Sequence, residues 1–167
     1  MYGHCVVIGD INHANIVVSK DEVIKLIDCD SVQFEASDMQ YLCGVGVDTY
    51  TPPELQGRPF DEVVRAPNHD AFGLAVAIFQ LLFLGRHPFS GRYLSSGDMP
   101  INRAISEFRF AYGSGAKANQ MAQPPATLPL DTVSPSVAAL FERAFSRNGL
   151  VMVCGLHLKN GSYRLRH

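Results

Sequence analysis

The sequence predicts a single α+β domain that is mostly helical and carries one small β-hairpin. Helical periodicity or capping signals occur in three segments: 70–84, 100–110 and 134–147. Short β-branched runs lie near the N-terminus: 5–8, 16–18 and 23–27. A chain of 167 residues is long enough to bury a core and short enough to form one domain.

The composition is that of an ordinary globular protein, with 47% hydrophobic residues, 18% charged residues and a formal net charge of −2. This balance argues against a disordered chain and offers no basic surface for nucleic acid. The longest apolar run, 71–85, is shorter than the roughly 20 residues that span a bilayer, so we expect a buried helix and no membrane contact. The cysteines form no C-x-x-C pair and no signal peptide is visible, which predicts a cytoplasmic protein: Cys5, Cys29, Cys43 and Cys154.

The first expected element is a hairpin formed by the runs 16–18 and 23–27, because the polar segment 19–22 separates them. The stretch 30–69 that follows is rich in Gly and Pro, so we expect irregular structure with one short helix near PPELQG. Irregular segments of this length inside a compact domain are usually functional or disordered.

The helix expected from Asp70 to Leu84 is apolar on nearly every side and should therefore be central. Asp70 would cap its start, and Gly85 would end it. Four phenylalanines in and after this helix are expected in the core: Phe72, Phe79, Phe83 and Phe89.

A second helix is expected over 100–110, followed by a loop over 111–133. In the third helix, Ser134 is the expected N-cap and Pro135 the first helical residue, with Asn148-Gly149 as the stop. The remaining residues alternate around an Asn-Gly pair and predict a local hairpin.

Three polar residues near the N-terminus are placed for chemistry. Asp10 and Asn15 flank one short loop, and Asp28 follows the hairpin. A strand pair brings the loop before it and the turn after it to the same edge, so the three side chains can converge. Mg²⁺ prefers hard oxygen ligands, and an aspartate beside a hydroxyl can accept its proton. Each residue alone also fits an ordinary turn, so the interpretation depends on their order and spacing.

Four ordered motifs resemble the C-terminal lobe of a eukaryotic-like protein kinase. IGDINHAN resembles the catalytic loop, with Asp10 as catalytic aspartate and Asn15 as metal ligand, and IKLIDCD resembles the strand that delivers the D-F-G aspartate, here Asp28. TPPE resembles the end of an activation segment at Glu54, and HDAFGLAVAIFQLLFLGRHPF resembles the central helix, beginning at Asp70. The sequences of these motifs most closely resemble those of bacterial kinases of the tellurite-operon and helix-hairpin-helix-linked type.

This resemblance implies transfer of the γ-phosphoryl group of ATP to a serine or threonine hydroxyl of a protein substrate. Asp10 would orient the acceptor hydroxyl, while Asn15 and Asp28 would hold Mg²⁺ against the phosphates. Residues 29–54 would present the substrate protein. Asp70 would brace the catalytic loop through backbone N–H groups, which is a structural role, as is that of Glu54.

The resemblance to kinases covers about residues 4–147. The chain departs from the kinase pattern before and after this range. Nine residues precede Asp10, too few for the Gly-rich loop, the phosphate-binding lysine and its paired glutamate. We therefore expect a partial domain, 1–147, whose N-terminal lobe is absent or supplied as a partner, and which is inactive alone if nothing replaces it. The tail, 148–167, lacks the usual Arg-Pro turn, so we expect a non-native or frameshifted end and a Glu54 without its buried partner.

Smaller departures lie in the motifs themselves. Ile8 and Gly9 replace the usual His-Arg pair, so no arginine is available at that position to bind an activation-loop phosphate. Asn12 stands where many kinases of this class carry lysine. The glycine pair in 44–46 reads as a flexible turn. The hydroxyls of 49–51 are either phosphorylation sites or ordinary loop groups.

Two other function classes stay open. The first is a catalytically inactive kinase-like lobe that acts as a protein-interaction module. The second is a small-molecule phosphotransferase of the aminoglycoside or choline type, since those enzymes also use G-D-x-x-x-x-N followed by I-D-x-D. TPPE followed by the Asp70 helix favours the protein kinase. Apolar surface around 5–8 and 16–27 predicts poor solubility in the absence of an upper lobe.

Overall fold

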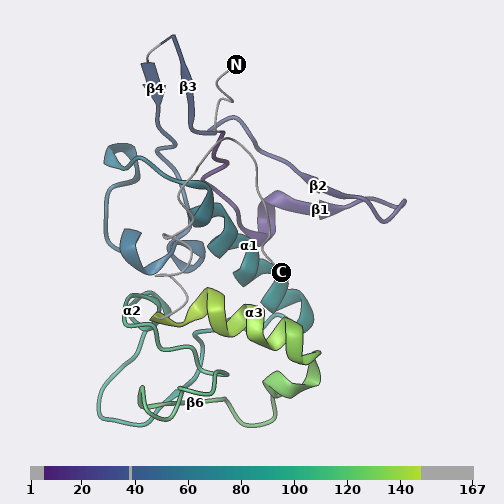
Figure 1. The fold of residues 1–167 in the computed structure, drawn as a ribbon, viewed down its shortest axis with the longest axis vertical. Coiled ribbons are helices and arrows are strands. Elements are labelled where there is room, and N and C mark those ends of the chain that lie inside the picture. The colour runs from purple at the N-terminus through teal and green to yellow at the C-terminus, as the bar shows by residue number, and fades with distance from the viewer. Residues whose placement is uncertain (1–5, 38, 148–167) are drawn as a thin grey trace.

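The long helix α1 (Pro67–Leu82) runs through the middle of the protein (Figure 1). The structure is a computed structural model that describes residues 6–37 and 39–147. Helix α3 (Pro135–Phe145) packs against α1, and the short helix α2 (Ile101–Ser106) contacts the turns that precede α1. The described part contains both helices and strands. Helices form its interior but do not make up most of its residues, so it is less helical than expected.

Three separate two-stranded antiparallel sheets occur in the described residues: β1 (Ile16–Val18) with β2 (Ile24–Leu26), β3 (Phe34–Ala36) with β4 (Met39–Tyr41), and β5 (Arg92–Tyr93) with β6 (Met121–Ala122). The first confirms the expected hairpin, with Val17 opposite Lys25. The β3–β4 and β5–β6 sheets were not expected. The prediction of a loop over 111–133 was wrong at Met121–Ala122, which form β6. Its pairing with β5 joins segments far apart in sequence and so leaves no local signal.

Between β4 and α1 the chain forms three single-turn 3₁₀ helices: Asp48–Tyr50, Pro53–Leu55 and Phe60–Glu62. The second of these falls on PPELQG, where a short helix was expected. Proline stands at or just before the first residue of the last two turns, which suits the fixed φ of proline and its missing N–H group.

Helix α1 begins at Pro67, three residues before the expected start at Asp70. The backbone N–H of Ala66 donates to Nδ1 of His69 at 3.0 Å, which caps the first turn. Asp70 therefore lies inside the first turn, where a carboxylate interacts favourably with the helix dipole. The helix ends where Leu84 and Gly85 adopt left-handed φ values of 54° and 80°.

Helices α2 and α3 are each shorter than expected. Helix α2 ends at Ser106 rather than near 110, and Phe108 follows with a positive φ of 56°. Helix α3 confirms the expected start, since Oγ of Ser134 accepts from the N–H of Val137 and Pro135 is the first helical residue. The expected stop at Asn148-Gly149 and the expected tail hairpin lie outside the described residues.

Phe79 on α1 is the centre of an aromatic core. Its ring stacks on Phe83 with centroids 4.1 Å apart and meets four other rings edge-on: Phe110, Tyr112, Phe141 and Phe145. Edge-to-face and offset-stacked pairs add stability beyond the buried area. The four phenylalanines expected in the core are all buried.

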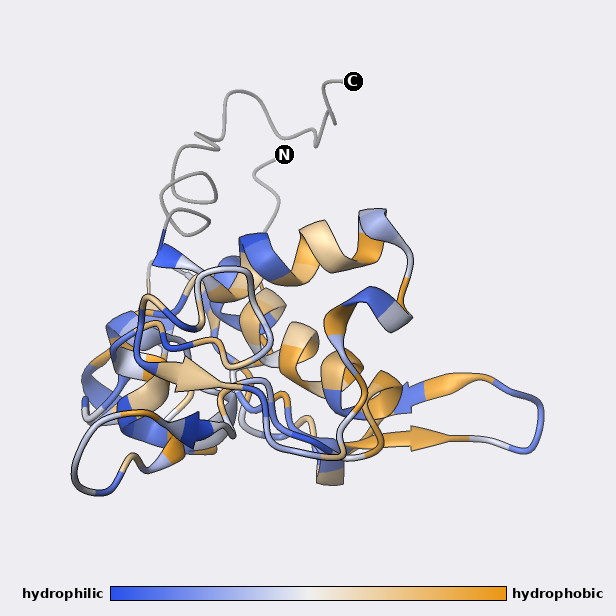
Figure 2. Ribbon diagram, turned by 90° about the horizontal axis from the view of Figure 1, so that it is seen from below, coloured by the Kyte–Doolittle hydropathy of each residue, from blue (hydrophilic) through white to orange (hydrophobic). Residues whose placement is uncertain are grey.

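The β1–β2 hairpin projects from this body, and Figure 2 shows hydrophobic residues along both strands and hydrophilic residues at the tip. Its exposed apolar side chains include Val18 and Ile24, each 68% exposed. Apolar strands that face solvent are typical of interaction surfaces. No helix in the described residues is long and apolar enough to cross a membrane.

Replacing Phe79 with alanine should lower the free energy of unfolding by about 3–5 kcal/mol, because the fully buried ring leaves a cavity among aromatic neighbours. Urea titration followed by circular dichroism would measure the change. Leu81→Ala on the same helix is the matched control, since Leu81 is 77% exposed and should cost no more than about 0.5 kcal/mol. Equal losses for the two variants would contradict the placement of the core.

Candidate active site

The loop 8–15 places Asp10 and Asn15 together. Nδ2 of Asn15 donates to Oδ2 of Asp10 at 3.1 Å and to the Asp10 carbonyl at 3.0 Å. Nδ2 of Asn12 donates to the other carboxylate oxygen of Asp10 at 3.0 Å, while Oδ1 of Asn12 accepts from the N–H of Ala14 at 2.9 Å. The carboxylate of Asp10 is therefore oriented by two amides of its own loop.

Asp28 lies two residues after β2, where the β1–β2 hairpin returns to this loop. The N–H of Ile27 donates to the Asn15 carbonyl at 2.9 Å, which carries the hairpin ladder up to the loop. The pKa of Asp28 is raised from its ordinary value, first by a hydrogen bond and charge repulsion from Asp30 and, to a smaller extent, by the charge of Asp10. The structure thus pairs Asp10 with Asn15 and returns the hairpin that carries Asp28 to their loop, while a shared cation site stays a prediction.

This group of oxygens fits a divalent cation. Both side-chain hydrogen bonds of Asn15 within the described residues use its NH₂ group, which leaves Oδ1 for a ligand. Asp30 and, more weakly, Asp10 raise the pKa of Asp28, which indicates a negative potential that a cation would relieve. No group of three His, Cys, Asp or Glu side chains in the described part could hold a metal alone. A cation here would therefore need the Asn15 amide and oxygens from a substrate.

Asp70 fixes the entry to the loop from below. Its two carboxylate oxygens accept the backbone N–H groups of Ile8 and Gly9, both at 2.8 Å. These contacts join residues more than 60 positions apart and tie the loop to the first turn of α1. Hydrogen bonds to a charged acceptor are stronger than those between neutral groups.

Tyr50 ties the same loop to the segment before α1, a link that no local sequence signal could have revealed. Its hydroxyl donates to Oε1 of Gln80 on α1 and lies 2.8 Å from Nδ1 of His13. Burial raises the pKa of Tyr50. Tyr50 and Thr51 are both buried, which favours ordinary structural hydroxyls over phosphorylation sites at these two positions.

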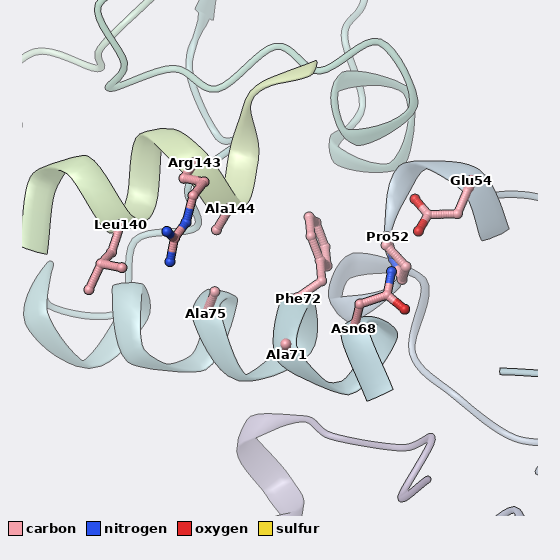
Figure 3. A pocket seen from close by; sticks show the side chains of 9 residues that line it. All are labelled: Pro52, Glu54, Asn68, Ala71, Phe72, Ala75, Leu140, Arg143 and Ala144. Carbon is pink, nitrogen blue, oxygen red and sulfur yellow. The ribbon is translucent and has the colours of Figure 1, made fainter. Parts of the chain in front are cut away.

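Glu54 borders a pocket of about 230 Å³ between α1 and α3 (Figure 3). Its Oε1 lies 3.5 Å from Nε2 of His69. The tail, which was expected to lack the arginine partner of Glu54, lies outside the described residues, so that expectation stays a prediction. Burial raises the pKa of Glu54 and lowers that of His69, which Arg65 lowers further. Arg143 lines the opposite end of the pocket, with Phe72 between the two charged groups.

His87 is a buried polar tie between the segment before α1 and the turn after it. The N–H of Phe89 donates to Nδ1 of His87 at 3.2 Å, so the neutral ring carries its proton on Nε2 and donates it to the Thr49 carbonyl at 2.8 Å. Burial lowers the pKa of His87 below 6.5.

No family model matches the chain. It is similar to protein kinase YegI of Escherichia coli (strain K12), with 42% identity over 151 residues, which is 89% of this chain. The protein of the same name from Escherichia coli O157:H7 gives the same identity and coverage. This similarity supports a kinase-related family. The chain spans 23% of the length of these relatives.

Replacing Asp70 with asparagine should lower the free energy of unfolding by about 1–3 kcal/mol, because one of the two part-buried N–H groups loses its acceptor. Asp21→Asn in the exposed hairpin turn is the matched control and should change it by less than about 0.5 kcal/mol. Chemical denaturation measures both variants, and a wild-type-like Asp70→Asn would contradict the bracing role.

The stability conferred by His87 should depend on pH. The pKa of the folded state lies below the unfolded value of 6.5, so the unfolded chain binds the extra proton first as the pH falls. Stability from this group is therefore complete above pH 6.5 and is lost below it, toward the folded pKa. Urea midpoints should fall more steeply for the wild type than for His87→Gln between pH 6.5 and about 5. Parallel curves would contradict this assignment.

Proposed function

We propose that this chain is the catalytic-loop part, residues 1–147, of a protein serine/threonine kinase that uses ATP and Mg²⁺. The observation that carries this proposal is the pairing of Asp10 with Asn15 on a loop that Asp70 braces and to which the hairpin returns Asp28. The similarity to a protein named as a kinase supports it.

In this mechanism Asp10 accepts a hydrogen bond from the substrate hydroxyl and turns its oxygen toward the γ-phosphorus. The amides of Asn12 and Asn15 keep the carboxylate of Asp10 in one orientation, so little ordering is left for the reaction step. Oδ1 of Asn15 and the carboxylate of Asp28 would hold Mg²⁺. Bound Mg²⁺ would neutralise charge on the transferring phosphate.

We also propose that an ATP-binding lobe covers the β1–β2 hairpin. Apolar residues of this hairpin are exposed on both strands, including Val17, Val18, Ile24 and Leu26. Exposed apolar strands beside a phosphate-binding edge would supply the floor against which a nucleotide base and a second lobe pack. The kinase-like C-lobe fold is part of this proposal.

Thermal unfolding with Mg·ATP provides the test. Wild-type chain should melt higher with Mg·ATP than without it, since a ligand that binds only the folded state stabilises it. Asp28→Asn should abolish the shift, whereas Asp10→Asn should keep it but lose transfer of labelled phosphate to serine/threonine peptides. Asp21→Asn is the control and should behave as wild type.

The other outcomes separate the alternatives. Absence of any Mg·ATP shift in the wild type would contradict the proposed site. A shift without transfer to any acceptor would indicate an inactive interaction module. Label on an aminoglycoside or choline, with none on protein, would indicate a small-molecule phosphotransferase.

A further inference from the structure

Arg65 is a buried cation on the approach to α1. Val63 is buried, Val64 is exposed and Arg65 is buried, so an extended backbone turns the arginine inward. Gln33 fixes this backbone on both sides: Oε1 accepts from the Arg65 N–H and Nε2 donates to the Arg65 carbonyl, each at 2.7 Å. Gln33 in turn pairs with Val7, at the start of the Asp10 loop.

The Arg65 guanidinium joins two segments that are far apart in sequence. Nη1 donates to the carbonyl of Gly9, the residue before Asp10, and Nη2 donates to the carbonyl of Val45 at 2.6 Å. The face of the guanidinium lies 4.5 Å from the centre of the Phe60 ring. Nε of Arg65 is buried without a hydrogen-bond partner among the described residues, so the two Nη bonds offset only part of the cost of burying a charge that is 5% exposed.

Two glycines make room for this guanidinium. A Cβ on Gly9, whose φ is +79°, would lie 2.9 Å from Nη1 and 2.5 Å from Sγ of Cys43. A Cβ on Gly46 would lie 3.1 Å from Nη2 and 3.1 Å from the Phe60 ring. The glycine pair in 44–46, first interpreted as a flexible turn, thus gains a packing reason at Gly46.

The backbone before Asp10 is therefore held by charges of opposite sign. The Gly9 N–H donates to the Asp70 carboxylate, and the Gly9 carbonyl accepts from the Arg65 guanidinium. That carbonyl belongs to the same peptide unit as the Asp10 nitrogen, so the contact limits rotation directly before the Asp10 side chain.

We propose that Arg65 is a positioning residue that locks the Asp10 loop onto the 43–47 segment without phosphorylation. Its acceptors are main-chain carbonyls, which are present in every state of the protein, so the lock is constitutive. The catalytic part of this proposal rests on the proposed function, whereas the mechanical lock does not.

Amide hydrogen exchange tests the lock directly. In Arg65→Ala, the exchange rate should rise about tenfold or more in peptides covering 6–15 and 42–48, with α1 and α3 little changed. The reason is that these two segments can open locally once the guanidinium no longer joins them. Arg65→Lys should show a smaller rise in the same peptides, since one ammonium cannot reproduce the planar fork. Millimolar methylguanidinium should restore protection in Arg65→Ala. Exposed Arg58→Ala is the matched control and should match wild type.

Several results would overturn the lock. If both peptides of Arg65→Lys exchanged at the wild-type rate, the proposed lock would be contradicted. The same measurement on Arg65→Lys tests the lock if Arg65→Ala does not fold. A rise spread evenly over α1 and α3 would also contradict the lock, because it would mean general destabilisation.

Kinetics separates this proposal from the proposed function. Where the wild type transfers phosphate, Arg65→Lys should lower kcat about tenfold, with the KM for ATP changed less than about twofold, because a misplaced aspartate slows the reaction step more than nucleotide binding. An unchanged kcat would overturn the positioning role. A wild type without transfer would refute the proposed function, while the exchange data would still decide the lock.

Discussion

The pair of hydrogen bonds from Ile8 and Gly9 to the carboxylate of Asp70 is the constraint on which the rest of the candidate site depends. It transfers the rigidity of α1 to a loop that has little regular structure of its own. Gly9 precedes Asp10, whose carboxylate accepts a hydrogen bond from the side-chain amide of Asn15. The Asn15 carbonyl in turn accepts from the N–H of Ile27, the residue before Asp28. A single carboxylate thus couples the packed core to the polar edge.

Helix α1 can anchor the loop because one of its faces is packed in the core while another is exposed. The Phe79 face is held by aromatic rings from two later segments, the loop after α2 and helix α3, so the helix cannot shift without opening the core. The exposed side of the same helix is free of such packing, as Leu81 shows. Gln80, between them, reaches the hydroxyl of Tyr50 and adds a second tie from α1 to the site.

Local features were predictable from sequence because their causes are local. The β1–β2 hairpin followed from two β-branched runs and a polar turn, and the start of α3 followed from Ser134 and Pro135. Helix α1 begins at Pro67 rather than at Asp70 because proline fits the first helical position, while the Asp70 carboxylate accepts N–H groups of the loop instead of capping the helix. That orientation was implied by the family resemblance alone.

Most of the contacts that could not be predicted from the sequence join distant segments. Arg65 reaches Gly9 across 56 positions, and Gln33 reaches Arg65 across 32. No periodicity or spacing marks such pairs, since an arginine in a polar stretch is ordinarily a solvated side chain. The β3–β4 pair was missed because its short strands lie inside a stretch dominated by Gly and Pro signals.

We propose that Asn15 and Asp28 hold one divalent cation beside Asp10. Titration of the isotope-labelled chain with Mn²⁺, followed by NMR line broadening, tests this claim most directly. Signals of the Asn15 side-chain amide and of the Asp28 backbone should broaden first, while those of α3 stay sharp. Broadening that begins elsewhere, or that leaves Asn15 and Asp28 untouched at saturating Mn²⁺, would contradict the account.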